Sequence, residues 1–263
     1  MIKLFAAVSM LVDHIGAIFF PYNIFMRIIG RLSMPLFGYC IARGFYYSEK
    51  KGKTNKYIKN LLIFSIVSQI PFSAVKFYIL GGLFKHSLTF NKFLKMFFSK
   101  NFFLSLELNI GFSWMMSVIL LKIIESLKGS NLKFRTFKIL SIILIVLLSI
   151  KVPIEGGLFV VLIPLIFYFC LFKFKNNLLC IILNIPIYLI YILANYVSFA
   201  FKKGFSFFIT IVTSDIECFY FLSIFLIIIF RKIDFKILPK RFFYCFYPMH
   251  FVVLLTSKLL FFN

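Results

Sequence analysis

Long apolar runs recur from one end of this sequence to the other, and they constrain the fold more than any other feature. A membrane-spanning helix needs about 20 predominantly apolar residues, and about nine such runs can be counted here. The runs are continuous and do not alternate with polar residues, so they predict helices and not barrel strands. With 62% hydrophobic residues and a mean hydropathy of +1.00, the chain is too apolar for a water-soluble domain.

We therefore predict an all-α, polytopic membrane helical bundle that forms a single domain over residues 1–263. The predicted spans are 2–20, 26–47, 57–80, 102–124, 138–152, 156–172, 178–200, 205–230 and 242–262. The fifth and sixth are short, and the alternative is that they are re-entrant or partly buried. The first run lacks a small-x-small cleavage site and carries Asp13 and His14. We expect it to be a retained first span and not a cleaved signal peptide.

The formal net charge of +22 suggests nucleic acid as a partner, but the positions of the charges argue against it. Lysines and arginines form short clusters between apolar runs, as loop charges of membrane proteins do. We expect a lipid bilayer and no nucleic acid as partner. The clusters follow the second, fourth, sixth and eighth spans, which predicts a cytoplasmic N-terminus. The exceptions are Lys85, Lys92, Lys95, Lys100, Lys202 and Lys203.

Ionisable side chains inside the apolar runs mark the predicted functional region. Asp13 lies in the first span, whereas Arg27 and Arg31 lie near the start of the second. Charges at this depth are costly in hydrocarbon and are by default functional. A helix rises about 1.5 Å per residue, which brings these three side chains to similar depth on neighbouring antiparallel helices. We expect Asp13 to pair with Arg27 or Arg31.

Two histidines lie near the predicted midplane of the membrane, His14 in the first span and His250 in the last. At this depth they can share one cavity. The structural alternative is that Asp13 and Arg31 form an ion pair that only fixes helix register, and that His250 bonds Tyr247 or a backbone carbonyl. A zinc site is not expected, because two histidines and one aspartate offer few ligands and no His-Glu-x-x-His spacing.

Weaker candidates lie in the middle of the chain. Asn109 and Ser113 are spaced i, i+4 inside the fourth predicted span, and Glu155 opens the sixth beside two glycines. Hydrogen bonds between helices explain most polar residues of this kind. Asn109 and Glu155 are the two we retain as candidates.

Several motifs occur in order along nearly the whole chain. They are MLVDHIG (10–16), RIIGRLSMPLF (27–37), ARGF (42–45), IVSQIPFS (66–73), LNIGFSW (108–114) and RFFYCFYPMH (241–250). With these motifs the sequence resembles the TraX family. The residues at the motif positions of interest are Asp13, His14, Arg27, Arg31, Arg43 and His250. One departure is Pro153-Ile154-Glu155-Gly156-Gly157, where related sequences carry an Asp-Tyr-Gly type of pattern.

The resemblance implies a multi-span acyltransferase. The named member of the family acetylates the N-terminus of conjugative pilin, and related membrane acyltransferases use acetyl-CoA to modify sugars, glycopolymers or peptides. The resemblance therefore implies that the protein transfers an acetyl group from cytoplasmic acetyl-CoA to an amine or hydroxyl acceptor. That acceptor is a pilin N-terminus or an envelope glycan or polymer, and the location is the inner membrane of a bacterium.

Acetyl transfer needs a base for the acceptor and a group that stabilises the oxyanion. His14, oriented by a carboxylate such as Asp13, can be the base. His250 can instead be the base or carry the acetyl group covalently. Arg31 and Arg43 are predicted to bind acetyl-CoA, with Arg43 near its phosphates. Arg27 or Arg31 can also stabilise the oxyanion or hold an acidic acceptor.

The predicted acceptor-binding residues are Arg27, Asn109 and Tyr247. A competing hypothesis is a transporter or flippase for an anionic lipid or sugar-phosphate, because buried arginines and a midplane histidine suit that function as well. No inverted repeat in the sequence supports the transporter.

Overall fold

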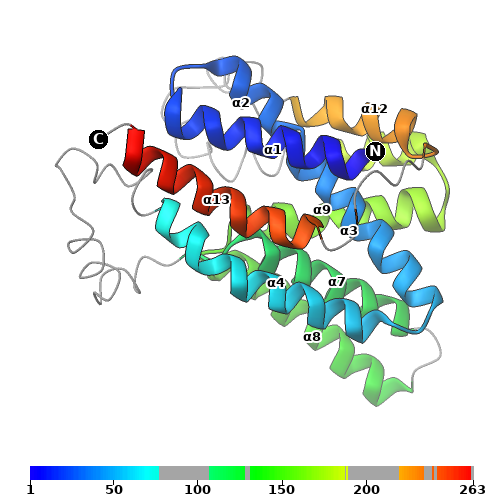
Figure 1. The fold of residues 1–263 in the computed structure, drawn as a ribbon. Helices are drawn as coiled ribbons and strands as arrows, with labels where there is room; N and C mark the ends of the chain where they lie inside the picture. The colour runs from blue at the N-terminus through cyan, green and yellow to red at the C-terminus, as the bar shows by residue number, and fades with distance from the viewer. Residues whose placement is uncertain are drawn as a thin grey trace, which may run out of the picture.

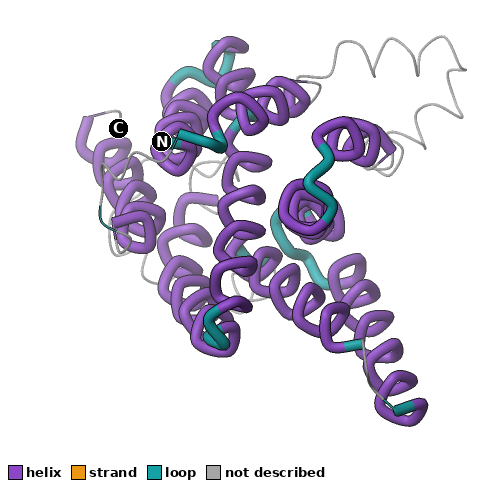
Figure 2. Tube along the Cα trace, turned by 90° about the vertical axis from the view of Figure 1, so that its right-hand side faces the viewer, coloured by secondary structure: helices purple, strands orange, loops and turns teal. Residues whose placement is uncertain are grey.

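The computed structural model describes residues 1–76, 107–127, 131–186, 188, 219–233, 239 and 242–261. Within these residues every regular element is a helix, as Figure 2 shows. The only extended pairing among them is an isolated bridge between Leu108 and Ile154. The predicted all-α class is confirmed for this part of the chain.

The bundle is built around α1, α3 and α7, each of which packs against several other helices. In Figure 1, α1 and α13 lie side by side, with α2 on one side of this pair and α4 on the other. The elements in order are α1 (Ile2–Phe19), α2 (Ile24–Arg31), α3 (Ser33–Lys50), α4 (Thr54–Val75), α7 (Ile110–Ser126), α8 (Leu132–Lys151), α9 (Gly157–Phe167), the π-helical turn η3 (Tyr168–Lys173), α12 (Tyr220–Phe230) and α13 (Phe242–Phe261).

The surface and length of the helices indicate a membrane protein. By length and composition, three described helices can cross a membrane: Ile2–Phe19, Ile24–Lys50 and Thr54–Val75. On α8, Ser149 is the one buried residue, and apolar side chains such as Leu144 face outward, as suits contact with lipid. The count of nine spans stays a prediction. Parts of the predicted spans 57–80, 102–124, 178–200 and 205–230 lie outside the described residues.

The second predicted span, 26–47, is interrupted near its start. α2 ends at Arg31 and α3 begins at Ser33. Pro35 has no N–H to donate to the carbonyl of Arg31, four residues earlier, so the helix is weakened there. Leu32, between them, keeps a right-handed helical backbone, so α2 and α3 follow each other as one stretch that packs on α1, and α3 also contacts α9 and α12 (Figure 1).

In the fourth predicted span, the prediction that Asn109 lies within a helix together with Ser113 is wrong. Asn109 has an extended backbone and caps α7, which starts at Ile110. Its Oδ1 accepts the Gly111 N–H at 2.9 Å, because a short amide side chain satisfies the free N–H groups of a helix start. Residues 102–106 lie outside the described part.

The starts of α7 and α9 lie next to each other inside the bundle. The Leu108 N–H donates to Pro153 O, and the Glu155 N–H donates to Leu108 O, both at 2.8 Å. The predicted break between the fifth and sixth spans is confirmed, because α8 ends at Lys151 and α9 begins at Gly157. Two irregular segments thus satisfy each other's backbone groups, as irregular backbone within a membrane must.

Candidate active site

Close packing of α1 on α2 creates the first part of the site. A β-carbon on Gly30 would clash with Asp13 Cβ, and one on Gly16 would lie 2.7 Å from Met26 Cβ. The two helices can approach this closely only because these positions lack side chains. The buried Asp13 therefore packs directly on α2, the helix that carries Arg27 and Arg31.

Asp13 forms ion pairs with both arginines, where the sequence predicted one or the other. Arg27 Nη1 lies 2.7 Å from Asp13 Oδ1, and Arg31 Nη1 lies 3.7 Å from Asp13 Oδ2. Arg27 also donates to the Asp13 backbone oxygen at 3.3 Å. Because a buried carboxylate is stable only when it is paired and hydrogen-bonded, the two arginines offset part of the cost of burying Asp13.

The first and last helices bring two histidines into contact. His14 Nδ1 lies 2.7 Å from His250 Nε2, and the two ring planes are 8° from parallel with centroids 5.0 Å apart. His250 Nδ1 lies 3.2 Å from the carbonyl oxygen of Phe246, one turn earlier on α13. The histidine pair therefore sits at the α1–α13 contact that is visible in Figure 1.

These partners assign the protons of a neutral histidine pair. A carbonyl oxygen only accepts, so the proton toward Phe246 belongs to His250 Nδ1. His250 Nε2 then has a lone pair and accepts from His14 Nδ1–H. His14 Nε2 consequently carries a lone pair and no proton, which makes His14 the member of the pair that can take a proton from a ligand.

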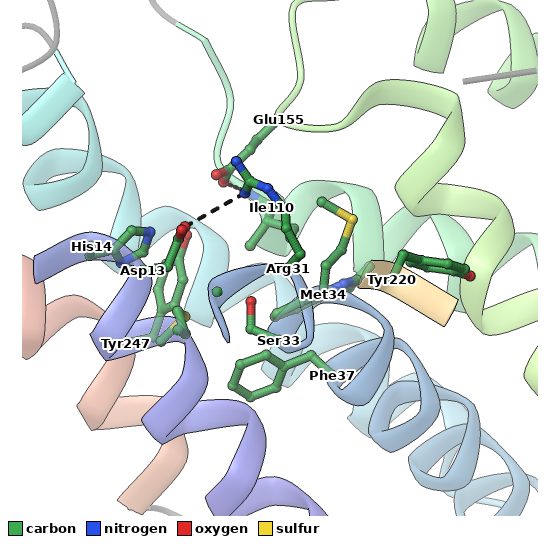
Figure 3. A pocket seen from close by; sticks show the side chains of 13 residues that line it. Asp13, His14, Arg31, Ser33, Met34, Phe37, Ile110, Glu155, Tyr220 and Tyr247 are labelled. Atoms are coloured by element: carbon green, nitrogen blue, oxygen red, sulfur yellow. Dashed lines mark hydrogen bonds and ion pairs between the residues drawn. The ribbon is translucent and has the colours of Figure 1, made fainter. Parts of the chain in front are cut away.

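A cavity of about 70 Å³ opens beside these groups. Its polar lining includes Asp13, His14, Arg31, Glu155 and Tyr247. Figure 3 shows Arg31 reaching into it toward Asp13. A water needs about 10–15 Å³ by the same measure, so the cavity holds several waters or a small acyl group. It is too small for a whole nucleotide cofactor.

Glu155, in the loop before α9, also lines the cavity, and its side chain is fixed by hydrogen bonds. Its Oε2 accepts the Ile110 N–H at 3.0 Å, and its backbone oxygen accepts from Ser113 Oγ at 3.1 Å. Its side chain also interacts with that of Tyr247 on α13. The carboxylate thus ties the start of α7 to the last helix.

The predicted site residues fall into three groups. Asp13, His14, Arg31 and Tyr247 line the cavity, whereas Arg27 and His250 contact them without lining it. Asn109 does not line the cavity. Its Nδ2 donates to Ser65 O at 2.7 Å and to Gln69 Oε1 at 2.9 Å. Arg43 lies apart, further along α3, with its guanidinium 5.8 Å from the Tyr47 ring centroid.

Trp114 lines the cavity, although the sequence analysis assigned it no role. It is 4% exposed, and its Nε1 has no hydrogen-bond partner among the described residues. A buried donor without a partner costs about 1–3 kcal/mol, so this one is unusual. The spacing could have revealed it, because Ile110 and Trp114 are i, i+4 and share a helix face.

Metal binding finds no support in the part of the chain that the structure describes. No group of three or more His, Cys, Asp or Glu side chains gathers there in a way that could hold an ion.

Comparison with known proteins gives a family and little else. A family model described as TraX protein matches residues 1–257. A protein of Rickettsia prowazekii (strain Madrid E), named "Uncharacterized protein RP591", is 36% identical over 70 residues. The matched stretch is 27% of this chain and 25% of the Rickettsia protein. No solved structure matches the chain.

Proposed function

This chain belongs to the TraX family, and from that premise we propose that it is a membrane-embedded acetyltransferase. It moves an acetyl group from acetyl-CoA to an amine or hydroxyl of a pilin or of an envelope glycan or polymer. The observation that carries this proposal is the 2.7 Å contact of His14 with His250, beside a cavity of acyl-group size. The family's association with pilin acetylation supports the same chemistry.

The proposed reaction uses His14 as the base. His14 Nε2 takes a proton from the acceptor amine or hydroxyl while the acceptor atom attacks the acetyl carbonyl carbon. The carbonyl π electrons move onto oxygen, and their return breaks the C–S bond. The CoA thiolate takes up the proton from His14, so the products are the acetylated acceptor and CoA. His250 acts through His14, because it fixes which nitrogen of His14 is unprotonated.

The charged groups around the cavity have separate proposed roles. Arg31 lines the cavity and is placed to stabilise the oxyanion or to hold an acidic acceptor. Arg27 makes the shorter pair with Asp13 and keeps that carboxylate in position. Tyr247 lies next to Glu155 in the lining and contacts the acceptor.

The proposed orientation brings the acetyl donor from the cytoplasm of a bacterium whose inner membrane holds the protein. The basic cluster Lys50, Lys51 and Lys53 lies at the end of α3, and by the positive-inside rule we assign this end to the cytoplasm. Arg43 lies twelve residues after Arg31, about 18 Å along the helix. The pantetheine arm of CoA bridges such a distance, which allows Arg43 to bind phosphates while the acetyl group enters the cavity.

Radiolabel transfer tests the proposal. The purified protein in detergent is incubated with acetyl-labelled acetyl-CoA and a crude envelope extract. We expect label on an extract component with wild type and none with His14→Ala of the same thermal stability. Absence of both label transfer and CoA release with a folded wild-type protein would refute the acetyltransferase.

One observation favours the alternative function, transport of an anionic lipid or sugar-phosphate. α7 and α9 both begin inside the bundle and pair at their starts, as discontinuous helices of transporters do. Saturable movement of such a substrate into vesicles without acetyl-CoA would favour the transporter. Movement that never exceeds that of protein-free vesicles would exclude it.

A further inference from the structure

A basic surface lies at the end of the bundle where α3 ends and α4 begins, and where α7 ends and α8 begins. Lys122 of α7 donates to Asn55 of α4, and Lys138 of α8 donates to the backbone oxygen of Ser126 on α7. These contacts bring the helix ends together. The exposed cations at this end, here the basic rim, are Lys50, Lys51, Lys53, Lys56, Lys59, Lys133 and Arg135.

The carboxylates described at this end do not balance the basic rim. Glu49 accepts a hydrogen bond from the Thr54 hydroxyl. Glu125 forms an ion pair with Lys173, which is not part of the rim. Within the described part of the chain, neither carboxylate forms an ion pair with a rim cation. The rim is therefore a surface of one sign, and it attracts anions.

Exposed apolar side chains lie among these cations and indicate which anion fits. At the start of α8, Leu132 is 81% exposed, Phe134 is 65% exposed and Phe137 is 69% exposed. α8 lies at the edge of the bundle (Figure 1), where it packs on α7 and α9, and its first two turns contain no buried residue. Cations mixed with aromatic side chains are typical of segments at the boundary between lipid headgroups and acyl chains. A soluble anion would leave these apolar side chains in water.

We propose that the basic rim binds the phosphate groups of anionic phospholipids. The apolar side chains at the start of α8 enter the acyl region, while the lysine and arginine side chains extend to the phosphates, as long cationic side chains do at a membrane surface. This inference concerns the lipid around the protein and does not depend on acetyl transfer. It makes anionic lipid a ligand of the folded protein.

A lipid titration tests the proposal. The full chain in a neutral detergent is titrated with phosphatidylglycerol and, separately, with phosphatidylcholine that has the same acyl chains. A ligand that binds only the folded state stabilises it. We therefore expect the melting temperature to rise more with phosphatidylglycerol, and the difference between the lipids to shrink at high salt. Equal rises with the two lipids would overturn the proposal.

Two soluble anions separate the lipid from other partners. Inorganic phosphate presents the same chemical group without acyl chains, and polyglutamate stands for an acidic protein. We expect neither to reproduce the rise in melting temperature, because only a lipid removes the apolar side chains of α8 from water. A full rise with either one would assign the rim to a soluble anion and overturn the proposal.

Removal of charge from the rim gives a second test. In Lys133→Gln/Arg135→Gln, we expect half of the rise in melting temperature to need about 30-fold more phosphatidylglycerol. The matched control is Lys151→Gln/Lys258→Gln, which removes the same charge outside the rim, near the ends of α8 and α13. This control should keep the wild-type titration. A wild-type midpoint in the rim variant would contradict the assignment of the rim to anionic lipid.

Discussion

Two groups of polar side chains lie at the cavity and behind it, and they meet different partners. The first, here the charged wall, comes from α1, α2 and α13 and consists of Asp13, His14, Arg27, Arg31 and His250, of which Asp13, His14 and Arg31 line the cavity. The second, here the capping wall, comes from α4, α7 and the loop before α9 and consists of Ser65, Gln69, Asn109, Ser113 and Glu155, of which Glu155 lines the cavity. Both walls place polar groups at depth in an apolar bundle, but their partners are not the same.

On the capping wall the partners are mostly backbone groups. Asn109 Nδ2 donates to Ser65 O at 2.7 Å, and Gln69 Nε2 donates to Glu107 O at 2.8 Å. Glu155 accepts a backbone N–H of α7 at 3.0 Å. These bonds satisfy the irregular backbone where α7 and α9 begin, which a membrane interior requires.

On the charged wall the partners are mainly other side chains. Asp13 meets two guanidinium groups, and His14 meets His250. This arrangement leaves a lone pair on His14 Nε2 and a guanidinium, that of Arg31, at the cavity. The contrast supports the proposed division, in which polar residues that meet backbone groups serve structure and those that meet one another supply the reactive groups.

The largest effect is expected from His14→Ala on the charged wall. Loss of a positioned base lowers the rate about 10²–10⁴-fold, so CoA release should fall to background while the melting temperature changes little. CoA thiol release and thermal unfolding in detergent measure the two quantities. Wild-type turnover in this variant would show that the charged wall is not the reactive one.

Asp13→Asn should sharpen the comparison through stability. It leaves Arg27 and Arg31 without their carboxylate, and removing one partner of a buried pair costs about 3–5 kcal/mol. We expect a strong loss of folded protein in thermal denaturation. A second variant that also carries Arg27→Gln should recover part of this loss, because it removes one unpaired charge. Equal stability of Asp13→Asn and wild type would contradict the pairing.

The two arginines should separate stability from turnover. Arg27 Nη1 lies 2.7 Å from Asp13 Oδ1. Arg27→Gln removes this ion pair and should lower the free energy of unfolding by about 1.5–3 kcal/mol, as for a hydrogen bond to a charged group. Arg31 is 3.7 Å from the carboxylate and lines the cavity. Arg31→Gln should therefore destabilise less and reduce kcat/KM more. The reverse order in unfolding and CoA-release assays would contradict these roles.

The smallest effect is expected on the capping wall. Asn109→Ala removes a helix cap, which costs about 1–2 kcal/mol. The melting temperature should fall, but CoA release per folded molecule should stay at the wild-type level. A drop in turnover without loss of stability would place Asn109 in acceptor binding, as the sequence first suggested.

Local chemistry in the sequence predicted much of the charged wall. The depth of Asp13 and the i, i+4 spacing of Arg27 and Arg31 were enough to predict their pairing. The contact of His14 with His250 required the packing of two helices separated by 236 residues, which no local pattern encodes. The interruption after Arg31 was missed although Pro35 is visible, because apolar periodicity continues through it.

The capping wall was harder to predict for a related reason. Asn109 stands among apolar residues, so hydropathy places it inside a span, whereas its amide ends the irregular segment and starts α7. Whether an asparagine caps a helix or crosses to a neighbour depends on the backbone around it. That backbone is set by the pairing of Leu108 with Ile154, which hydropathy does not register.

A double-mutant cycle on the histidine pair tests the central claim most directly. CoA release is measured for wild type, His14→Ala, His250→Ala and the double variant, with His250→Gln as the variant that keeps an acceptor for His14 Nδ1–H. If His250 acts only through His14, the double variant is no slower than His14→Ala, and His250→Gln is faster than His250→Ala. Losses that multiply, with no rescue by glutamine, would mean that His250 reacts independently and would contradict the assignment of His14 as the base.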